Sequence, residues 1–200
     1  MDRVAAIILA GGRSIRFGTP KPFLKNNNSI TFLEGLVNVY LEFGCTDIIL
    51  VLNQNLLDAF TNIYTESFRS KIKVVYNNKT ELGRFYSLKL GVHAAPNSNY
   101  CFVQNIDNPF TDSDTLRKLY HNRKADAYIS PVYLNKGGHP ILLSRMIIEM
   151  IRKETKISLN TKEFLYQFNK KTVEVENDKI SANINTPEDY FREFHFSGNI

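Results

Sequence analysis

The chain has 200 residues, a formal net charge of +5 at neutral pH and an isoelectric point near 9.1. Hydrophobic residues make up 43% of it and charged residues 22%, a balance typical of a globular protein and unlike that of a disordered or fibrous one. No apolar run is long enough to span a membrane and no block of like charge appears, so we expect neither a membrane nor a nucleic acid as partner. With no recognisable linker, the length predicts one domain over residues 1–200.

Short apolar runs alternate with helical stripes as far as residue 123. The runs predict strands at 4–9, 47–53, 72–76 and 100–104. Apolar residues at helical spacing predict helices at about 29–44, 57–68, 85–95 and 113–123, the last capped by Asp112. Such an alternation with short connections predicts an α/β fold: a three-layer, Rossmann-like, mostly parallel sheet with helices on both faces.

The remainder of the chain predicts a small antiparallel element near the C-terminus. The stretch "DAYISPVYLNKGGHPILL" at 126–143 predicts two strands around a glycine turn. Helices are expected at about 144–153 and 162–168, and Pro187 is typical of the start of a terminal helix. Between them, "KTVEVENDKISANI" at 171–184 predicts a hairpin whose turn is Asn177–Asp178.

The two cysteines, Cys45 and Cys101, stand alone in or beside apolar segments. Isolated cysteines without CxxC spacing indicate reduced thiols rather than a disulfide framework or a zinc site. We therefore expect a cytoplasmic protein.

Polar and flexible residues follow four of the predicted strands, where ligands bind in open parallel sheets. These segments are the loop after Leu9, the pair Asn53 and Gln54, the loop after Tyr76, and "NIDNPF" after Gln104. The first of them carries Gly11, Gly12, Arg16 and Lys21 but has neither a GxGxxG nor a P-loop ending. Glycine amides and two cations suit a phosphate group, and a solvated turn with incidental cations is an equal alternative.

Two further residues have both a chemical and a structural interpretation. Asp107 directly follows a buried strand, where a carboxylate can hold Mg²⁺ against phosphate oxygens. The alternative is a turn aspartate that bonds its own backbone. His139 in "GGHPILL" either packs in the core, the more common role of a lone histidine, or touches the substrate.

Taken together, these motifs resemble the small nucleotidyltransferases related to the molybdenum-cofactor guanylyl- and cytidylyltransferases. The matching segments are "LAGGRSIRFGTPK" at 9–21, "GRFYSLKLGV" at 83–92, "IDNP" at 106–109, "GGHPILL" at 137–143 and "NINTPEDY" at 183–190. The resemblance implies Arg16, Lys21 and Asp107 as catalytic residues, with Mg²⁺ as cofactor held by Asp107 and Asn185. It also implies a nucleotide pocket that comprises Leu9, Ala10, Gly11, Gly12, Lys21, Gly83 and Ser87; Asn53 is added to this expected pocket because it ends a predicted strand.

The implied reaction is transfer of NMP from an NTP to a phosphate-bearing small molecule, with release of pyrophosphate. Branch signals point in two directions, because Pro20 is cytidylyltransferase-like and "NINTPEDY" is guanylyltransferase-like, so the nucleotide is CTP or GTP. One alternative is a sugar- or alditol-phosphate nucleotidyltransferase. Another is an inactive nucleotide-binding module, since Ile106 replaces the family's glycine and Asn185 stands where cytidylyltransferases often have aspartate.

Overall fold

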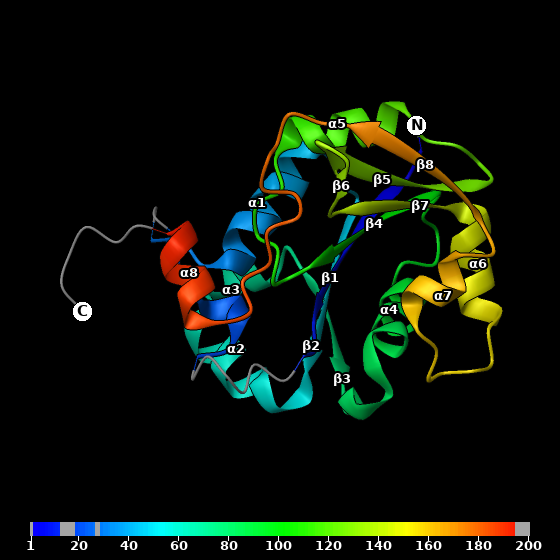
Figure 1. The fold of residues 1–200 in the computed structure, drawn as a ribbon. Helices are drawn as coiled ribbons and strands as arrows, with labels where there is room; N and C mark the ends of the chain where they lie inside the picture. The colour runs from blue at the N-terminus through cyan, green and yellow to red at the C-terminus, as the bar shows by residue number, and fades with distance from the viewer. Residues whose placement is uncertain (1, 13–18, 27–28, 195–200) are drawn as a thin grey trace.

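Eight strands form one sheet in the order β3-β2-β1-β4-β7-β5-β6, with β8 paired to β5 (Figure 1). The computed structural model describes residues 2–12, 19–26 and 29–194. The strands are β1 (Val4–Ala10), β2 (Asp47–Asn53), β3 (Lys73–Asn77), β4 (Tyr100–Asn105), β5 (Ala127–Tyr133), β6 (Lys136–Gly137), β7 (Ile141–Ser144) and β8 (Asn169–Glu174).

The first four strands are parallel, and β1 lies between β2 and β4. Strand β7 then runs antiparallel between β4 and β5, while β8 pairs with β5 in parallel. All seven residues of β1 are buried because both faces of the sheet are covered, which is why this strand is a continuous apolar run. The predicted α/β fold with a mostly parallel sheet is confirmed.

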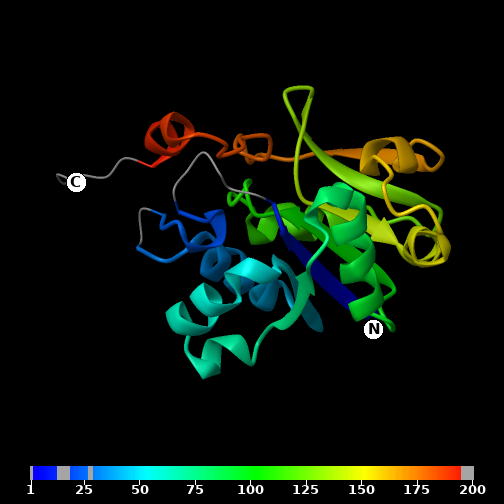
Figure 2. The same ribbon diagram turned by 90° about the horizontal axis from the view of Figure 1, so that it is seen from below.

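Helices cover the two faces of the sheet in separate groups (Figure 1). One face carries α1 (Phe32–Phe43), α2 (Leu57–Ile63), α3 (Glu66–Arg69), α5 (Ser113–His121) and α8 (Pro187–Glu193); the other carries α4 (Gly83–Ala94), α6 (Arg145–Lys153) and α7 (Thr161–Leu165). Alternate residues of β1 serve the two cores: Ile8 packs in the cluster with Leu36 of α1, and Ile7 packs with Leu88 of α4. Figure 2 shows the β5–β6 hairpin projecting from the rest of the molecule.

Two expected elements differ from the structure. The predicted helix at 57–68 is two helices, because Tyr64 is extended and the side chain of Thr65 begins α3 by accepting from the Phe68 N–H. The buried hydroxyl of Tyr64 hydrogen-bonds Thr31 and the Pro22 carbonyl, so tertiary contacts hold the break.

The predicted hairpin at 171–184 is wrong. Only its first arm is a strand, β8, and this strand pairs with β5 rather than with residues 179–184. The antiparallel part of the sheet is β5, β6 and β7, and the turn between β5 and β6 uses Leu134 and Asn135 at positive φ rather than glycines. Within the described residues, no helix is both long and apolar enough to cross a membrane.

Candidate active site

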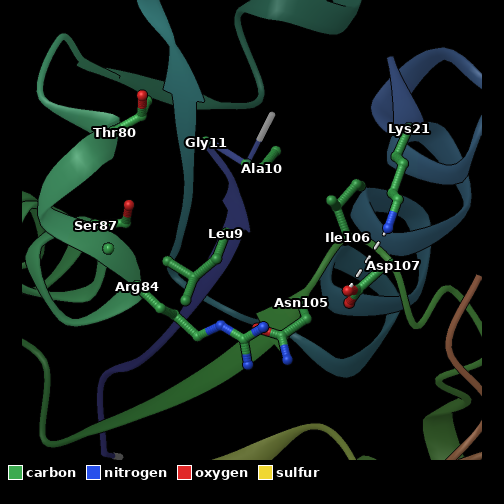
Figure 3. Close-up of a pocket in the computed structure, with 12 residues that line it drawn as sticks. Leu9, Ala10, Gly11, Lys21, Thr80, Arg84, Ser87, Asn105, Ile106 and Asp107 are labelled. Atoms are coloured by element: carbon green, nitrogen blue, oxygen red, sulfur yellow. Dashed lines mark ion pairs between the residues drawn. The ribbon is translucent and has the colours of Figure 1, made fainter. Parts of the chain in front are cut away.

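A pocket of about 170 Å³ lies beyond the carboxyl ends of β1 and β4, where the strand order changes direction. The described residues that line it are Leu9, Ala10, Gly11, Gly12, Lys21, Thr80, Gly83, Arg84, Ser87, Asn105, Ile106 and Asp107. Figure 3 shows Thr80 and Ser87 on one side of the pocket and Lys21 with Asp107 on the other. Segments after three of the four predicted strand ends therefore meet here.

The α4 side of the pocket is built for close approach of a ligand to the backbone. Gly83 begins α4 with φ of +82°, which favours glycine, and it brings the positive end of the helix to the pocket. Ser87 lies against Gly11, where a Cβ would come within 3.4 Å of Ser87 Oγ. The fully buried Asn77 donates its Nδ2 to Ser87 Oγ at 2.9 Å and so fixes that side chain.

Lys21 is held in place by an anchored turn. It begins the short 3-10 helix η1 (Lys21–Phe23), in which Pro22 and Phe23 are buried. The Phe23 N–H donates to the Pro20 carbonyl at 3.0 Å, and the Pro22 carbonyl accepts from Tyr64. The backbone of Lys21 is thereby fixed, and its side chain, 14% exposed, points at the end of β4 (Figure 3).

Asp107 and Asn185 come together because two segments far apart in the chain are tied to each other. The carbonyl of Asp107 accepts from the Ile184 N–H at 2.7 Å. Asn108 is fully buried and donates its Nδ2 to the carbonyls of Ile180 at 2.9 Å and Ala182 at 2.6 Å. These bonds bring the segment 180–185 to the loop after β4 and place Asn185 beside the pocket.

The three side chains meet around one ammonium group. Lys21 Nζ lies 3.0 Å from Asn185 Oδ1 and 3.8 Å from Asp107 Oδ2. The other carboxylate oxygen, Oδ1 of Asp107, is buried and has no hydrogen-bond partner among the described residues, so Asp107 does not serve as a simple turn aspartate. Asn185 does not cap α8 either, because Thr186 does so by accepting from the Asp189 N–H.

Most of the predicted site residues line the pocket; the exceptions are Asn185, which lies beside it against Lys21, and the two residues Asn53 and Arg16. Asn53 is not among the residues that line the pocket: its side chain accepts from the Asn55 N–H at 3.0 Å and starts the 3-10 helix η2 (Gln54–Leu56). Arg16 falls outside the described residues. Sequence reasoning did not single out Thr80, Arg84 or Asn105, although Arg84 stands inside the "GRFYSLKLGV" segment and Asn105 directly precedes "IDNP".

The chemistry of this group fits a hard divalent cation. Asp107 and Asn185 offer only oxygen ligands, and the lone pairs of Asp107 Oδ1 are unused within the described structure. The described ranges hold no cluster of three or more His, Cys, Asp or Glu that could enclose a metal. Two protein oxygens are few, and that suits Mg²⁺, which keeps several waters and takes further ligands from substrate phosphates.

A second and larger pocket, about 730 Å³, adjoins the first and shares Leu9, Arg84 and Asn105 with it. Tyr128 and Tyr166 contribute aromatic surface to it, and three cations also line it: Arg84, Lys162 and Lys170. Among the described residues that line this pocket there is no Asp or Glu. The pocket therefore favours an anionic ligand with a flat apolar part.

His139 lies on the wall of the second pocket, next to the first. It is partly buried, and its Nε2 is 2.7 Å from Nδ2 of Asn105. Burial lowers the pKa of His139 from its usual value and the charge of Arg84 lowers it further, while Asp107 and the Val103 backbone oppose the change. The ring is thus neutral at neutral pH.

Known proteins are similar to this chain in sequence and in fold. The sequence matches the MobA-like NTP transferase domain over residues 6–168. It is 30% identical over 193 residues to the molybdenum cofactor cytidylyltransferase of Escherichia coli, covering 95% of both chains. It is 32% identical over 136 residues to the probable molybdenum cofactor guanylyltransferase of a Geobacillus species, covering 64% of both chains.

The fold is shared with a Mycobacterium tuberculosis protein solved as a complex with manganese, with a TM-score of 0.76 and 20% identity over 96% of this chain and 98% of that one. The family match covers most of the chain, and all the residues that line the first pocket lie inside the matched range. The chain belongs to the MobA-like NTP transferase family, a family of nucleotidyltransferases.

Proposed function

We propose that this protein transfers CMP from CTP to a molybdopterin-type phosphate acceptor and releases pyrophosphate. The observation that carries the proposal is the meeting of Lys21, Asp107 and Asn185 at the mouth of a glycine-walled pocket. CTP is favoured over GTP because the cytidylyltransferase relative matches 95% of the chain, against 64% for the guanylyltransferase relative.

In this reaction an oxygen of the acceptor phosphate forms a bond to the α-phosphorus of the nucleotide. The bond from the α-phosphorus to the bridging oxygen breaks, and that oxygen leaves with pyrophosphate. The acceptor phosphate is already ionised at neutral pH, so the chain needs no general base. What the protein must supply is alignment of the two reactants and stabilisation of developing charge.

The described residues divide this work between them. Backbone groups of Gly11 and Gly12 and the N-terminus of α4 would approach the phosphates closely. Lys21 would neutralise charge on the departing pyrophosphate. Ser87, fixed by Asn77, would hold the nucleotide against the α4 side of the pocket.

Asp107 and Asn185 would hold Mg²⁺, which would supply neutralisation of the negative charge on the phosphates. The acceptor would occupy the second pocket, whose cations and aromatic rings suit a phosphorylated heterocycle. The two reactants would then meet at the wall that both pockets share, formed by Leu9, Arg84 and Asn105.

The test combines each of the four common NTPs with Mg²⁺ and with either molybdopterin or glucose 1-phosphate, and measures pyrophosphate. We expect release with CTP and molybdopterin together, and little with either alone. Release with glucose 1-phosphate but not with molybdopterin would assign the chain to the sugar-phosphate class of nucleotidyltransferases. No pyrophosphate from any pair, in a protein that binds CTP by calorimetry, would make it a nucleotide-binding module.

A further inference from the structure

Asn105 stands in the wall between the two pockets and is held there by His139. It ends β4, is only 5% exposed, and contributes to the lining of both pockets. The backbone of His139 is itself fixed, because the His139 backbone N–H donates to the Ile180 carbonyl at 2.9 Å. The residue before it, Gly138, lies so close to the Ile180 backbone that a Cβ would clash there. The ring therefore has little freedom to move away from Asn105.

The state of the His139 ring decides which way the Asn105 amide faces. An amide nitrogen can only donate, so the contact between Nδ2 of Asn105 and Nε2 of His139 requires Nε2 to be an unprotonated acceptor. The ring proton then sits on Nδ1, a buried atom that has no hydrogen-bond partner among the described residues. With Nδ2 engaged by His139, the carbonyl oxygen of Asn105 is turned away from the ring.

The oxygen of Asn105, together with Arg84, determines which ligand groups can bind where the two pockets meet. Figure 3 shows the guanidinium group of Arg84 reaching toward Asn105. Arg84 is a donor that attracts a phosphate, whereas the Asn105 oxygen accepts hydrogen bonds and repels other acceptors. A ligand that satisfies both carries a phosphate and, close to it, an N–H or O–H group.

We propose that His139 is a positioning residue that fixes the Asn105 amide, and that the Asn105 oxygen selects acceptors bearing an N–H or O–H donor near their phosphate. This inference rests on the proposed function, since it assigns the acceptor to the second pocket. His139 does not touch the reacting phosphorus. It acts through Asn105, so its effect falls on acceptor binding rather than on the nucleotide.

The test compares two replacements at this position in the full-length protein. His139→Phe keeps a flat ring but removes the acceptor atom, while His139→Gln can offer an amide oxygen to Asn105 Nδ2. We expect His139→Phe to raise the KM for molybdopterin roughly tenfold, the loss of one good hydrogen bond, with the KM for CTP and kcat nearly unchanged. His139→Gln should restore most of the affinity.

Asn105→Ala completes a double-mutant cycle with His139→Phe. If His139 acts through Asn105, the double variant Asn105→Ala/His139→Phe should bind molybdopterin no worse than Asn105→Ala alone. Asn105→Ala also keeps the test informative if His139→Phe does not fold, because it should by itself raise the molybdopterin KM by a larger factor than the CTP KM. Additive losses in the double variant would overturn the inference, as would equal shifts in both KM values.

The outcomes separate this inference from the proposed function. A wild-type protein that forms no product from CTP and molybdopterin defeats the proposed function. A wild-type protein that forms product, with a molybdopterin KM that neither His139→Phe nor Asn105→Ala changes, defeats the inference about His139 alone.

Discussion

At the scale of single residues, Lys21 engages two oxygen ligands with one ammonium group. Its Nζ contacts Asn185 Oδ1 at 3.0 Å and faces Asp107 Oδ2 at 3.8 Å. The same two side chains are those proposed to hold Mg²⁺. In the nucleotide-free protein, the ammonium group and the proposed metal would therefore compete for these oxygens. Phosphates of a bound nucleotide would offer Lys21 a charged alternative and relieve that competition.

This competition predicts the behaviour of Lys21→Met. Without nucleotide, the variant should bind Mn²⁺ roughly tenfold more tightly, a change of about 1.4 kcal/mol, because a competing charge is gone. Its turnover should fall about 10²–10³-fold, since Lys21 no longer neutralises the leaving group. Electron paramagnetic resonance of free Mn²⁺ measures the first effect. Lys25→Met, which changes an exposed lysine of the same segment, is the control. Unchanged Mn²⁺ affinity in Lys21→Met would rule out the competition.

Asp107 and Asn185 should respond unequally to a change of charge. Asp107→Asn leaves two neutral amides at the metal position and should reduce turnover by about 10²–10³ or more. Asn185→Asp adds a carboxylate and should tighten Mg²⁺ binding with a smaller effect on turnover. Calorimetric Mg²⁺ titrations with and without CTP measure both, with Asp178→Asn at an exposed position as control. Wild-type Mg²⁺ affinity and activity in Asp107→Asn would refute the metal site.

At the scale of elements, one buried amide joins the loop after β4 to the segment that leads into α8. Asn108 is fully buried and donates to the carbonyls of Ile180 and Ala182. Asn108→Ala should cost about 2–4 kcal/mol, because it removes a fully buried donor from the Ala182 carbonyl and one of the two donors, the other being the His139 backbone N–H, from the Ile180 carbonyl. It should also weaken Mg²⁺ binding through displacement of Asn185.

Urea denaturation measures the cost of Asn108→Ala. Asn169→Ala is the matched control, because it removes an exposed amide that bonds Asp126, and it should change stability by less than about 0.5 kcal/mol. Equal losses in the two variants would mean that Asn108 does not join the segments.

Two helical glycines should react oppositely to the same substitution. Gly91 of α4 packs directly on Ile7 and Val51, and a Cβ there would overlap Ile7 and come within 3.1 Å of Val51. Gly91→Ala should therefore push α4 off the sheet and cost about 1–3 kcal/mol. Gly35→Ala in α1 meets only ordinary contacts at 3.8 Å and beyond, so it should be neutral or stabilising by up to about 1 kcal/mol. Thermal denaturation compares them, and a stabilised Gly91→Ala would contradict this packing.

At the scale of the whole molecule, the sequence predicts those site residues whose position follows from the nearby strand and motif. Gly11, Lys21 and Asp107 follow predicted strands and stand in quoted motifs, and all three line the pocket. Asn185 was expected beside Asp107 only through the resemblance, and what joins them is a set of bonds from Asn108 and Ile184. Such long-range bonds leave no periodic signal in the sequence.

Where the structure differs from what the sequence predicts, the cause is again a contact that the local sequence pattern does not reveal. Residues 171–184 alternate like a hairpin, but β8 finds a better partner in β5 and the second arm is tied to Asn108 instead. Asn53 ends a parallel strand, as Asn77 and Asn105 do, but its side-chain oxygen accepts from the Asn55 N–H in the turn that starts η2. Arg84 and Asn105 gain their importance only from the junction of two pockets, which the fold creates.

The central claim is that the chain moves a nucleotidyl group, and one labelling measurement tests it most directly. CTP labelled at the α-phosphorus or at the γ-phosphorus is incubated with the protein, Mg²⁺ and molybdopterin, and the products are separated. Because the proposed reaction breaks the bond between the α-phosphorus and the bridging oxygen, the α label should appear in the molybdopterin product and the γ label in pyrophosphate. A γ label on the acceptor, or an α label found only in free CMP, would contradict nucleotidyl transfer.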